Sequence, residues 1–384
     1  MLGFVLKKFL YGSSLLFGVL SLVFLLFAVN PVDPARMLGG QFTDEATLTS
    51  IRAKYGLDKS LSEQYLNYLE RLSPIGFSEG LEIKAPDLGL SYRSGRPVWD
   101  ILAETIPNSF ILALFSIGLA MILGVLLGAF AAFKKGEGWD KFIIAISALG
   151  MAGPSFFVGM LISWLFGFKW SESFSLPIVP ILLLVLYVFI YPKLKRAPRG
   201  KWVNVVFLGI LAASFWLPGI EMGGTGLDMT GSLYEIDPFK GRVLNLKSLI
   251  LPTLTLGIRP LSVIVQLTRN SLLDVLSSDY IRTAKAKGLS DTKIFIHHAL
   301  APALNPVITA ASGWFAGMLA GAVFVEFIFG WRGLGLELFE ALQNEDQPVV
   351  MGAVLFFAAV FVIINILVDI SYAYLDPRIR LNKS

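Results

Sequence analysis

The sequence predicts an all-α integral membrane protein, and three observations indicate this fold class. Of its 384 residues, 55% are hydrophobic and only 16% are charged, whereas a soluble domain carries about 25% charged residues. The apolar residues form long blocks, several of about 20 residues, which is the helix length that crosses a bilayer core. Polar segments rich in lysine and arginine separate these blocks. We therefore expect most of the chain to lie in lipid.

Composition also excludes several classes of chemistry. The chain has no cysteine and only two histidines, which are adjacent. A disulfide framework, a thiolate nucleophile and a cysteine-ligated metal are thereby excluded, and a histidine-rich metal site is not expected. The net charge of +4 is too small to indicate nucleic-acid binding. It fits basic loops beside anionic lipid.

Six apolar blocks predict core membrane helices, because a helix pairs all the backbone polar groups that hydrocarbon cannot satisfy. They cover residues 9–29, 103–133, 142–167, 249–267, 304–328 and 349–373. The first block could be read as a signal peptide, but it is long for one and no small-residue cleavage site follows, so an uncleaved anchor is favoured. Two weaker runs, 177–192 and 202–218, predict an inserted two-helix hairpin. Eight spans are favoured, although the first weak run is short and contains two prolines.

The distribution of basic residues orients the chain. Eighteen of the 32 lysines and arginines fall near Lys7 and Lys8, in the loops at 134–141, 193–201 and 269–300, and in the last nine residues. Placing these segments inside puts both termini in the cytoplasm. We therefore expect a multi-pass protein of the cell inner (plasma) membrane.

The same pattern predicts the domain organisation. Residues 1–30 form an N-terminal anchor, 31–100 an extracellular or periplasmic cap, 101–376 the main membrane domain and 377–384 a cytoplasmic tail. In the cap, residues 44–72 show helical apolar spacing in two stretches, with Gly56 between them as a helix end.

The most unusual loop is "SDYIRTAKAKGLSDTKIFIHHAL", residues 278–300, which lies between two apolar blocks. Its spacing predicts a helix from Tyr280 to Lys287 capped by Asp279, a turn at Gly288, and a second helix capped by Ser290 or Asp291. Ile281, Ala284 and Gly288 would share one face of small or apolar side chains. That face suits insertion into a groove on another protein. A helix pair resting on lipid headgroups is the alternative.

This loop resembles the coupling loop of ABC importer permeases of the binding-protein-dependent family. The family pattern is E-A-A-x-x-x-G followed by I-x-L-P. Aligned on Gly288, the chain has "RTA" in place of "EAA" and "HALA" in place of the last motif. The resemblance is closest to the di- and oligopeptide permease branch, whose loop reads D-Y-x-R-T-A-x-A-K-G-L-S and then H-A-L. The departures from the general motif are thus those of the branch.

The resemblance extends over most of the chain. The segments "YGLDKSLSEQYLNYL", "DLGLSYRSGRPVWDIL", "SLILPTLTLG", "GWRGLGLELFEAL", "DQPVVMGAVL" and "VDISYAYLDPRIR" are similar to segments of the first of the two peptide permeases in that branch. It implies a type I ABC importer transmembrane fold with six core helices, plus the hairpin, which falls in a region longer than usual at 177–247. That insertion leaves the substrate class more open than the coupling mechanism.

The resemblance also implies a mechanism and a set of partners. A separate ATPase would grip residues in the coupling loop 270–300, namely Asp279, Tyr280, Arg282, Thr283, Ala284, Lys285, Ala286, Lys287, Gly288, Leu289 and Ser290. The chain has no G-x-x-x-x-G-K-[ST] motif, so ATP and Mg would bind to partner subunits and this chain would be a transport subunit without its own ATPase site. The expected partners are a second, different permease, two ATP-binding subunits and an extracytoplasmic substrate-binding protein.

Two charged residues are candidates for the substrate path or a gate. Arg259 falls in the middle of a predicted span, where it could hold a peptide carboxylate or pair with an acid such as Asp369. Glu326 lies at the end of another span and resembles a family glutamate. A gate or structural hydrogen bond is favoured for it over binding of a substrate amine.

Other functions stay open at this point. The same machinery could import nickel or another small solute. A secondary transporter working without ATP would predict inverted repeats and charged relays at mid-membrane, and neither is visible. An intramembrane enzyme would need paired aspartates, H-E-x-x-H or G-x-S-x-G within a span, and none occurs.

Overall fold

The computed structural model describes residues 2–29, 34–39, 44–73, 75–76, 82–83, 85–176, 178–194, 200–214, 220–239 and 241–375. In these residues the chain is mainly helical, and the strands form short antiparallel pairs. Two compact units can be distinguished, one made of Met1–Ile117 with Ile308–Ser384 and the other of Gly118–Val307. Two long helices, α5 (Val98–Phe133) and α13 (Leu300–Gly321), contribute to both units.

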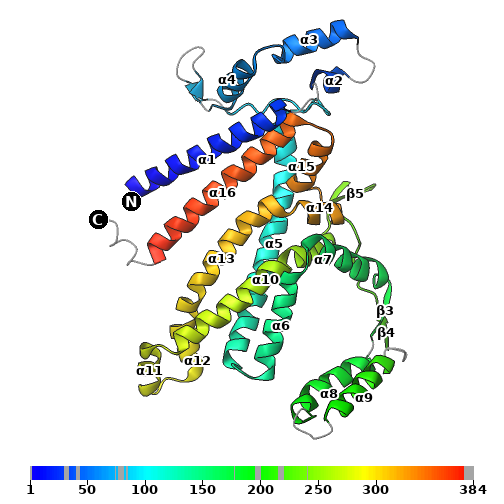
Figure 1. Ribbon diagram of the computed structural model, residues 1–384, viewed down its shortest axis with the longest axis vertical. Helices are drawn as coiled ribbons and strands as arrows, with labels where there is room; N and C mark the ends of the chain where they lie inside the picture. The colour runs from blue at the N-terminus through cyan, green and yellow to red at the C-terminus, as the bar shows by residue number, and fades with distance from the viewer. Residues whose placement is uncertain are drawn as a thin grey trace. The chain divides into compact units, whose positions relative to one another are not determined.

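The first unit joins the two ends of the chain. Besides its parts of α5 and α13, its elements are α1 (Leu2–Val29), α2 (Pro34–Gly39), α3 (Glu45–Tyr55), α4 (Leu61–Leu72), β1 (Ile75–Gly76), β2 (Glu82–Ile83), α14 (Val323–Phe329), α15 (Leu334–Gln343) and α16 (Gln347–Leu375). The terminal helices α1 and α16 lie side by side (Figure 1). The predicted cap helices are confirmed as α3 and α4, and Gly56 ends α3 in the left-handed conformation with φ of 67°.

Two apolar clusters hold the described part of the first unit together, and the one with more buried residues lies around the start of α5. It joins the end of α4 to the start of α5, to α15 and to α16, through Leu72, Leu88, Val98, Leu102, Leu334 and Val349. Phe24 of α1 packs against Tyr65 of α4, with ring centroids 5.1 Å apart. The N-terminal helix and the cap are thus both packed against α16 and its neighbours.

The second unit carries the remaining elements. They are α6 (Gly138–Ala152), α7 (Ser155–Ile162), the π-helix η1 (Ser163–Lys169), β3 (Ser173–Leu176), α8 (Ile178–Leu194), α9 (Gly200–Ser214), β4 (Ile220–Gly223), β5 (Tyr234–Asp237), β6 (Gly241–Leu244), α10 (Lys247–Leu276), α11 (Asp279–Ala286), α12 (Asp291–Ile294) and the π-helix η2 (Phe295–Ala299). Helix α10 packs against α6 and α7. Close approach is possible because Gly128 of α5 lies against the Val265 carbonyl and Gly150 of α6 lies against Ser262.

The membrane helices agree with the predicted core pattern in number. Among the described residues five helices are long and apolar enough to cross a bilayer, and a sixth crossing is available if a bent pair is one span. That bent pair corrects the prediction of a continuous span at 142–167, because α6 and α7–η1 meet at 105°. The bend falls at Gly153 and Pro154. Proline disfavours helical backbone in the residue before it, and Gly153 is accordingly extended, with φ of −82° and ψ of 142°.

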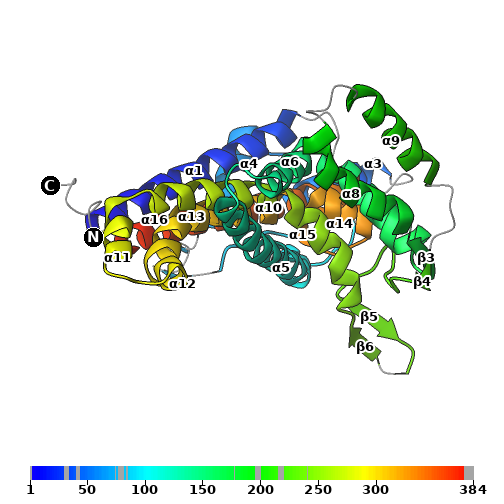
Figure 2. The same cartoon turned by 90° about the horizontal axis from the view of Figure 1, so that it is seen from below.

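One other predicted span is also altered, and the predicted hairpin is present. The block 304–328 is not one helix, since α13 ends at Gly321 and α14 begins at Val323. The inserted hairpin is present as the packed pair α8 and α9, which lie side by side in both views (Figures 1 and 2). Their described lengths of 17 and 15 residues correspond to about 25 and 22 Å of helix, against about 30 Å of hydrocarbon. Eight crossings therefore remain a prediction.

Candidate functional site

The polar loop predicted at 270–300 is a helix–turn–helix that packs onto the C-terminal end of α10. Helix α11 begins at Asp279 after Ser278, which corrects the predicted cap by one residue. Gly288 has φ of +79°, the left-handed conformation that ends a helix and that glycine adopts at little cost. Ser290 caps α12, its hydroxyl accepting a hydrogen bond from the Lys293 amide at 3.4 Å.

Two of the three residues of the predicted small-residue face, Ile281 and Ala284, point inward, whereas Gly288 is exposed; for the first two this corrects the prediction. Ile281 is fully buried and Ala284 is 8% exposed, both against residues of the same chain. The cluster that covers them consists of Ala129, Ala132, Leu272, Ile294, Ala299 and Ala303. A face already packed inside the chain is not available to a groove on another protein. The physical reason is that an isolated short helix can be held in place only by burying its apolar side.

The opposite face of α11 is open. It carries Tyr280, Arg282, Thr283, Lys285 and Ala286, and the C-cap residue Lys287 follows them; all six are exposed. Ion pairs support the helix locally: the Arg282 guanidinium lies 2.7 Å from Asp279, and the Lys285 ammonium lies 3.7 Å from Asp291 in the next helix. The predicted coupling residues are therefore brought together as one exposed basic ridge, with two exceptions: Ala284 is buried beneath it and Leu289 is partly buried against the same cluster.

A buried ion pair anchors α10 just before this loop. The Arg269 guanidinium donates two hydrogen bonds to the Asp140 carboxylate, from Nε at 2.6 Å and from a terminal nitrogen at 2.7 Å. The Gly136 amide donates a third at 2.8 Å. Asp140 is 2% exposed, so the pair fixes the turn between α5 and α6 to α10. Sequence reasoning missed this pair, because no local pattern links residues 129 positions apart.

Glu326 is fully buried and acts as a hydrogen-bonding centre. The Ser109 hydroxyl donates to one carboxylate oxygen at 2.6 Å, and the Leu336 amide donates to the other at 2.9 Å. The Ser109 oxygen in turn accepts from the Leu334 amide at 2.8 Å. With 0% of its surface exposed, this carboxylate has no open side for a substrate amine. This geometry fits a structural hydrogen bond, which is one of the two roles, gate or structural hydrogen bond, favoured from the sequence.

The glycines of "GWRGLG", residues 330–335, leave the space that the Glu326 hydrogen bonds need. Gly330 closes α14 with φ of +61°. A Cβ atom on Gly333 would collide with both the Glu326 carboxylate and the Ser109 hydroxyl, and one on Gly335 would lie 3.0 Å from the same carboxylate. Trp331, fully buried, donates from its indole nitrogen to the Asn108 carbonyl at 3.1 Å. The loop after α14 is thus tied to α5.

A second buried carboxylate, Asp346, holds the segment that leads into α5. It accepts hydrogen bonds from the Ser91 hydroxyl at 2.5 Å and from the amides of Tyr92 and Arg93 at 3.0 and 3.3 Å. Asp346 is 4% exposed. Burial and this carboxylate raise the pKa of the Tyr92 hydroxyl to about 12. The sequence offered no signal for this contact beyond its resemblance to family segments at both ends.

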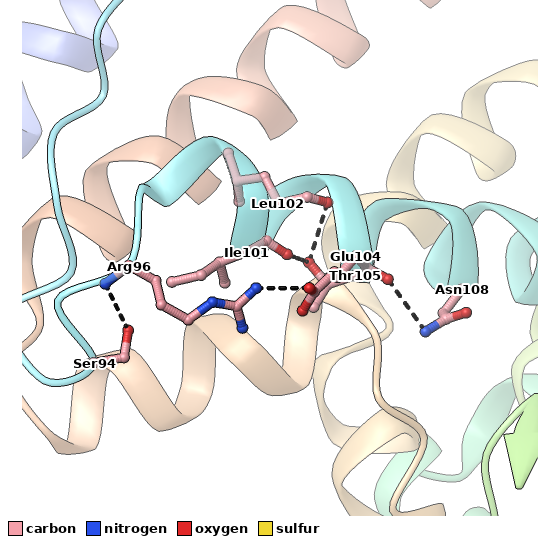
Figure 3. A network of polar contacts seen from close by, with 7 residues as sticks. All are labelled: Ser94, Arg96, Ile101, Leu102, Glu104, Thr105 and Asn108. Atoms are coloured by element: carbon pink, nitrogen blue, oxygen red, sulfur yellow. Dashed lines mark hydrogen bonds and ion pairs between the residues drawn. The ribbon is translucent and has the colours of Figure 1, made fainter. Parts of the chain in front are cut away.

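Further polar contacts follow at the turn before α5 and along the first part of that helix (Figure 3). The Ser94 hydroxyl accepts from the Arg96 amide at 3.4 Å, and the Arg96 guanidinium pairs with Glu104 at 2.6 Å. Asn108 of the same helix donates to the Arg332 carbonyl at 2.6 Å. One face of the start of α5 therefore carries a continuous polar network.

A polar pocket of about 380 Å³ lies beside this network, lined by Ser91, Arg93, Ser94, Glu337, Glu340, Ala341, Asn344 and Asp346. Burial raises the pKa of the Glu337 carboxyl, and the nearby carboxylates of Glu340 and Asp346 add to the shift. Arg93 lies 3.9 Å from Glu340, which leaves the pocket with an excess of acid.

Arg259 stands apart from these networks. It is exposed, near the middle of α10. The suggested partner Asp369 has a side chain outside the described residues, so that pairing stays a prediction.

The described residues thus define a class of protein: a multi-pass helical membrane protein with an exposed basic helix–turn–helix between two candidate spans. Comparisons with known proteins identify its family. A profile described as "Binding-protein-dependent transport system inner membrane component" matches residues 124–381, and one for the N-terminal part of the same kind of component matches residues 1–113.

Whole-length relatives agree. The chain is 32% identical to the dipeptide transport system permease protein of Escherichia coli strain K12 over 384 residues, covering 100% of both chains. It is 32% identical to the glutathione transport system permease protein of Escherichia coli O6:H1, covering 99% of both. It is 33% identical to the di/tripeptide transport system permease protein of Pseudomonas aeruginosa, again covering 99% of both.

The chain therefore belongs to the family of binding-protein-dependent transport system inner membrane components. It is a multi-pass inner-membrane permease subunit of an ABC importer with the type I transmembrane fold, and it works with other permease, ATPase and binding-protein subunits. Members of this family are permeases rather than catalytic subunits, which agrees with the predicted transport role.

Proposed function

We propose that this permease imports peptides. The supporting observation is similarity over essentially the whole chain to permeases whose names specify dipeptides, di- and tripeptides, and glutathione. All three substrates share amide groups and a free carboxylate.

The proposed energy source is ATP bound with Mg on two partner ATPases. We infer that these contact the open ridge of α11, because its charged side chains are exposed while its other face is buried. ATP would favour one global state of the complex, and the difference in affinity between states would move the membrane helices. The Asp140–Arg269 pair would carry that movement from α10 to the α5–α6 turn.

The orientation we propose puts α11 and both termini in the cytoplasm and the cap outside. The distribution of basic residues supports it. The cap, fastened through Asp346, would then face the extracytoplasmic binding protein. The second permease is proposed to be a different chain, as is usual in the peptide branch that this sequence resembles.

Uptake by the reconstituted complex tests the substrate. Proteoliposomes containing this chain and its partner subunits, with the binding protein outside, should accumulate labelled dipeptide only with internal ATP. Excess nickel should not compete. Uptake of nickel instead of peptide, or peptide uptake by this chain alone on an ion gradient, would contradict the proposal.

Gly288 provides a sharper test of coupling. No atom lies within 4 Å of a Cβ at this position, so the constraint is the backbone and not space. A β-branched residue in the left-handed conformation costs about 1–2 kcal/mol, whereas asparagine tolerates it. Gly288→Val should displace α11 from α12 and reduce both ATPase co-purification and uptake, with membrane insertion unchanged. Gly288→Asn is the matched control and should retain both.

Equal co-purification and uptake for the two variants would show that the geometry of this turn does not control coupling.

A further inference from the structure

Helix α10 carries an exposed arginine, Arg259, which is unusual for a membrane-spanning helix. In the described residues α10 is the most buried candidate span, with 67% of its apolar window covered against 33% or less in the other four. Arg259 nevertheless lies exposed near its middle. No hydrogen bond or ion pair to Arg259 is found among the residues that the structure describes.

The polar character continues along the same face. At about 100° per residue, positions seven and eleven residues further on return to within about 20° of Arg259. These positions are Gln266, which is half-buried, and Asn270, which is exposed. The helical rise places them about 10 and 17 Å from Arg259 along the axis. The Arg269 guanidinium donates to the Asn270 side-chain oxygen at 3.1 Å. We call Arg259, Gln266 and Asn270 the polar row.

The apolar stretch of α5 gives a contrast, because its most exposed side chains are large hydrophobic ones. They include Phe115, Ile122, Leu126 and Phe133, exposed by 52 to 65%. An arginine facing hydrocarbon at mid-membrane costs about 3 kcal/mol even on the lowest scale. The polar row therefore faces water or protein. A single ion pair with a neighbouring subunit would explain Arg259 but would not require two amides along the same line.

We propose that the polar row lines the translocation path and that Arg259 binds the terminal carboxylate of a passing peptide. Guanidinium binds carboxylate through two parallel hydrogen bonds. The amide side chains of Gln266 and Asn270 can both donate to and accept from peptide backbone. An extended chain advances about 3.3 Å per residue, so the distance from Arg259 to Gln266 corresponds to about three residues. This inference rests on the proposed peptide substrate.

The absence of cysteine from this chain permits a direct test in the full complex, with the partner subunits also made free of cysteine. Arg259→Cys should react with a water-soluble cationic thiol reagent, 2-aminoethyl methanethiosulfonate, and added dialanine should slow that reaction. Leu126→Cys is the matched control and should not react. Uptake by Arg259→Cys should fall about tenfold or more, as expected for loss of a charged hydrogen bond. The cationic reagent should restore much of it, and neutral methyl methanethiosulfonate should not.

The outcomes separate the alternatives. If wild-type complex imports no peptide, the proposed function fails. If it does import, but Arg259→Cys is unreactive or transports normally, the polar row is not in the path. If the variant complex fails to assemble, or is rescued by reversing an acidic residue in the second permease, Arg259 pairs between subunits and the inference is overturned. Equal effects on dialanine and its C-terminal amide would also overturn carboxylate recognition.

Discussion

Removing the Asp140 charge should destabilise the second unit strongly. Asp140→Asn keeps the side-chain volume but converts an acceptor of three charge-assisted or backbone hydrogen bonds into a neutral amide. The Arg269 contacts at 2.6 and 2.7 Å are two of the three. The Arg269 side chain is only 18% exposed, so little water can replace them.

The expected loss follows from this burial. Removing one partner of a buried ion pair costs about 3–5 kcal/mol, because the remaining charge is left uncompensated. We expect about 3 kcal/mol, the lower end, since Arg269 keeps some contact with solvent. The free energy of unfolding can be measured by equilibrium denaturation in mixed detergent micelles. Asp140→Asn, Arg269→Gln and the double variant form a double-mutant cycle.

The double variant distinguishes an ion pair from two separate packing effects. It leaves two neutral amides and no unpaired charge, so its loss should be smaller than the two single losses combined by about 2 kcal/mol. Losses that add to within about 0.5 kcal/mol, which is the behaviour of independent sites, would refute the ion-pair reasoning.

Three further changes test the first unit. Gly333→Ala should lower the free energy of unfolding by about 1–3 kcal/mol, as overpacking does, because the new Cβ would meet the buried Glu326 carboxylate. Gly317→Ala is the control, since nothing lies within 4 Å of a Cβ there, and this variant should melt at or above the wild-type temperature. Asp346→Ala should free the segment 91–93 and make limited proteolysis there faster, and unchanged cleavage would contradict its role. The pKa of the Glu337 carboxyl is raised in the folded state. The contribution of this carboxyl to the free energy of unfolding is therefore fully present below about pH 4, and it is lost as the pH rises through the pKa of the folded state. Glu337→Gln should therefore raise the melting temperature at pH 8 but scarcely at pH 4, and an equal rise at both would argue against this titration.

Much of the membrane architecture could be predicted because apolar length is a local property. The spans at 9–29, 103–133, 249–267 and 349–373 each fall within a single described helix. The bend at Pro154 was also readable in principle, since a proline preceded by glycine is a strong helix-breaking signal. It was missed because mean apolarity continues across the break.

The long-range hydrogen bonds that hold the buried carboxylates could not be predicted from local sequence pattern. Ser109 and Glu326 are 217 residues apart, and Ser91 and Asp346 are 255 apart. The spacing of Ile281 and Ala284 correctly indicated one face of a helix, but spacing does not say what covers that face. The structure shows that the chain itself covers Ile281 and Ala284, which is why we propose the charged ridge as the contact surface for a partner instead.

Labelling at position 285 tests most directly whether the exposed ridge of α11 is the surface that contacts the ATPase subunit. Lys285→Cys, on the exposed face, should react with an impermeant thiol reagent only from the cytoplasmic side and should cross-link to the ATPase subunit. Ala284→Cys, one residue away and buried, should do neither. Reaction of Lys285→Cys only from outside the cell would contradict both the orientation and the coupling.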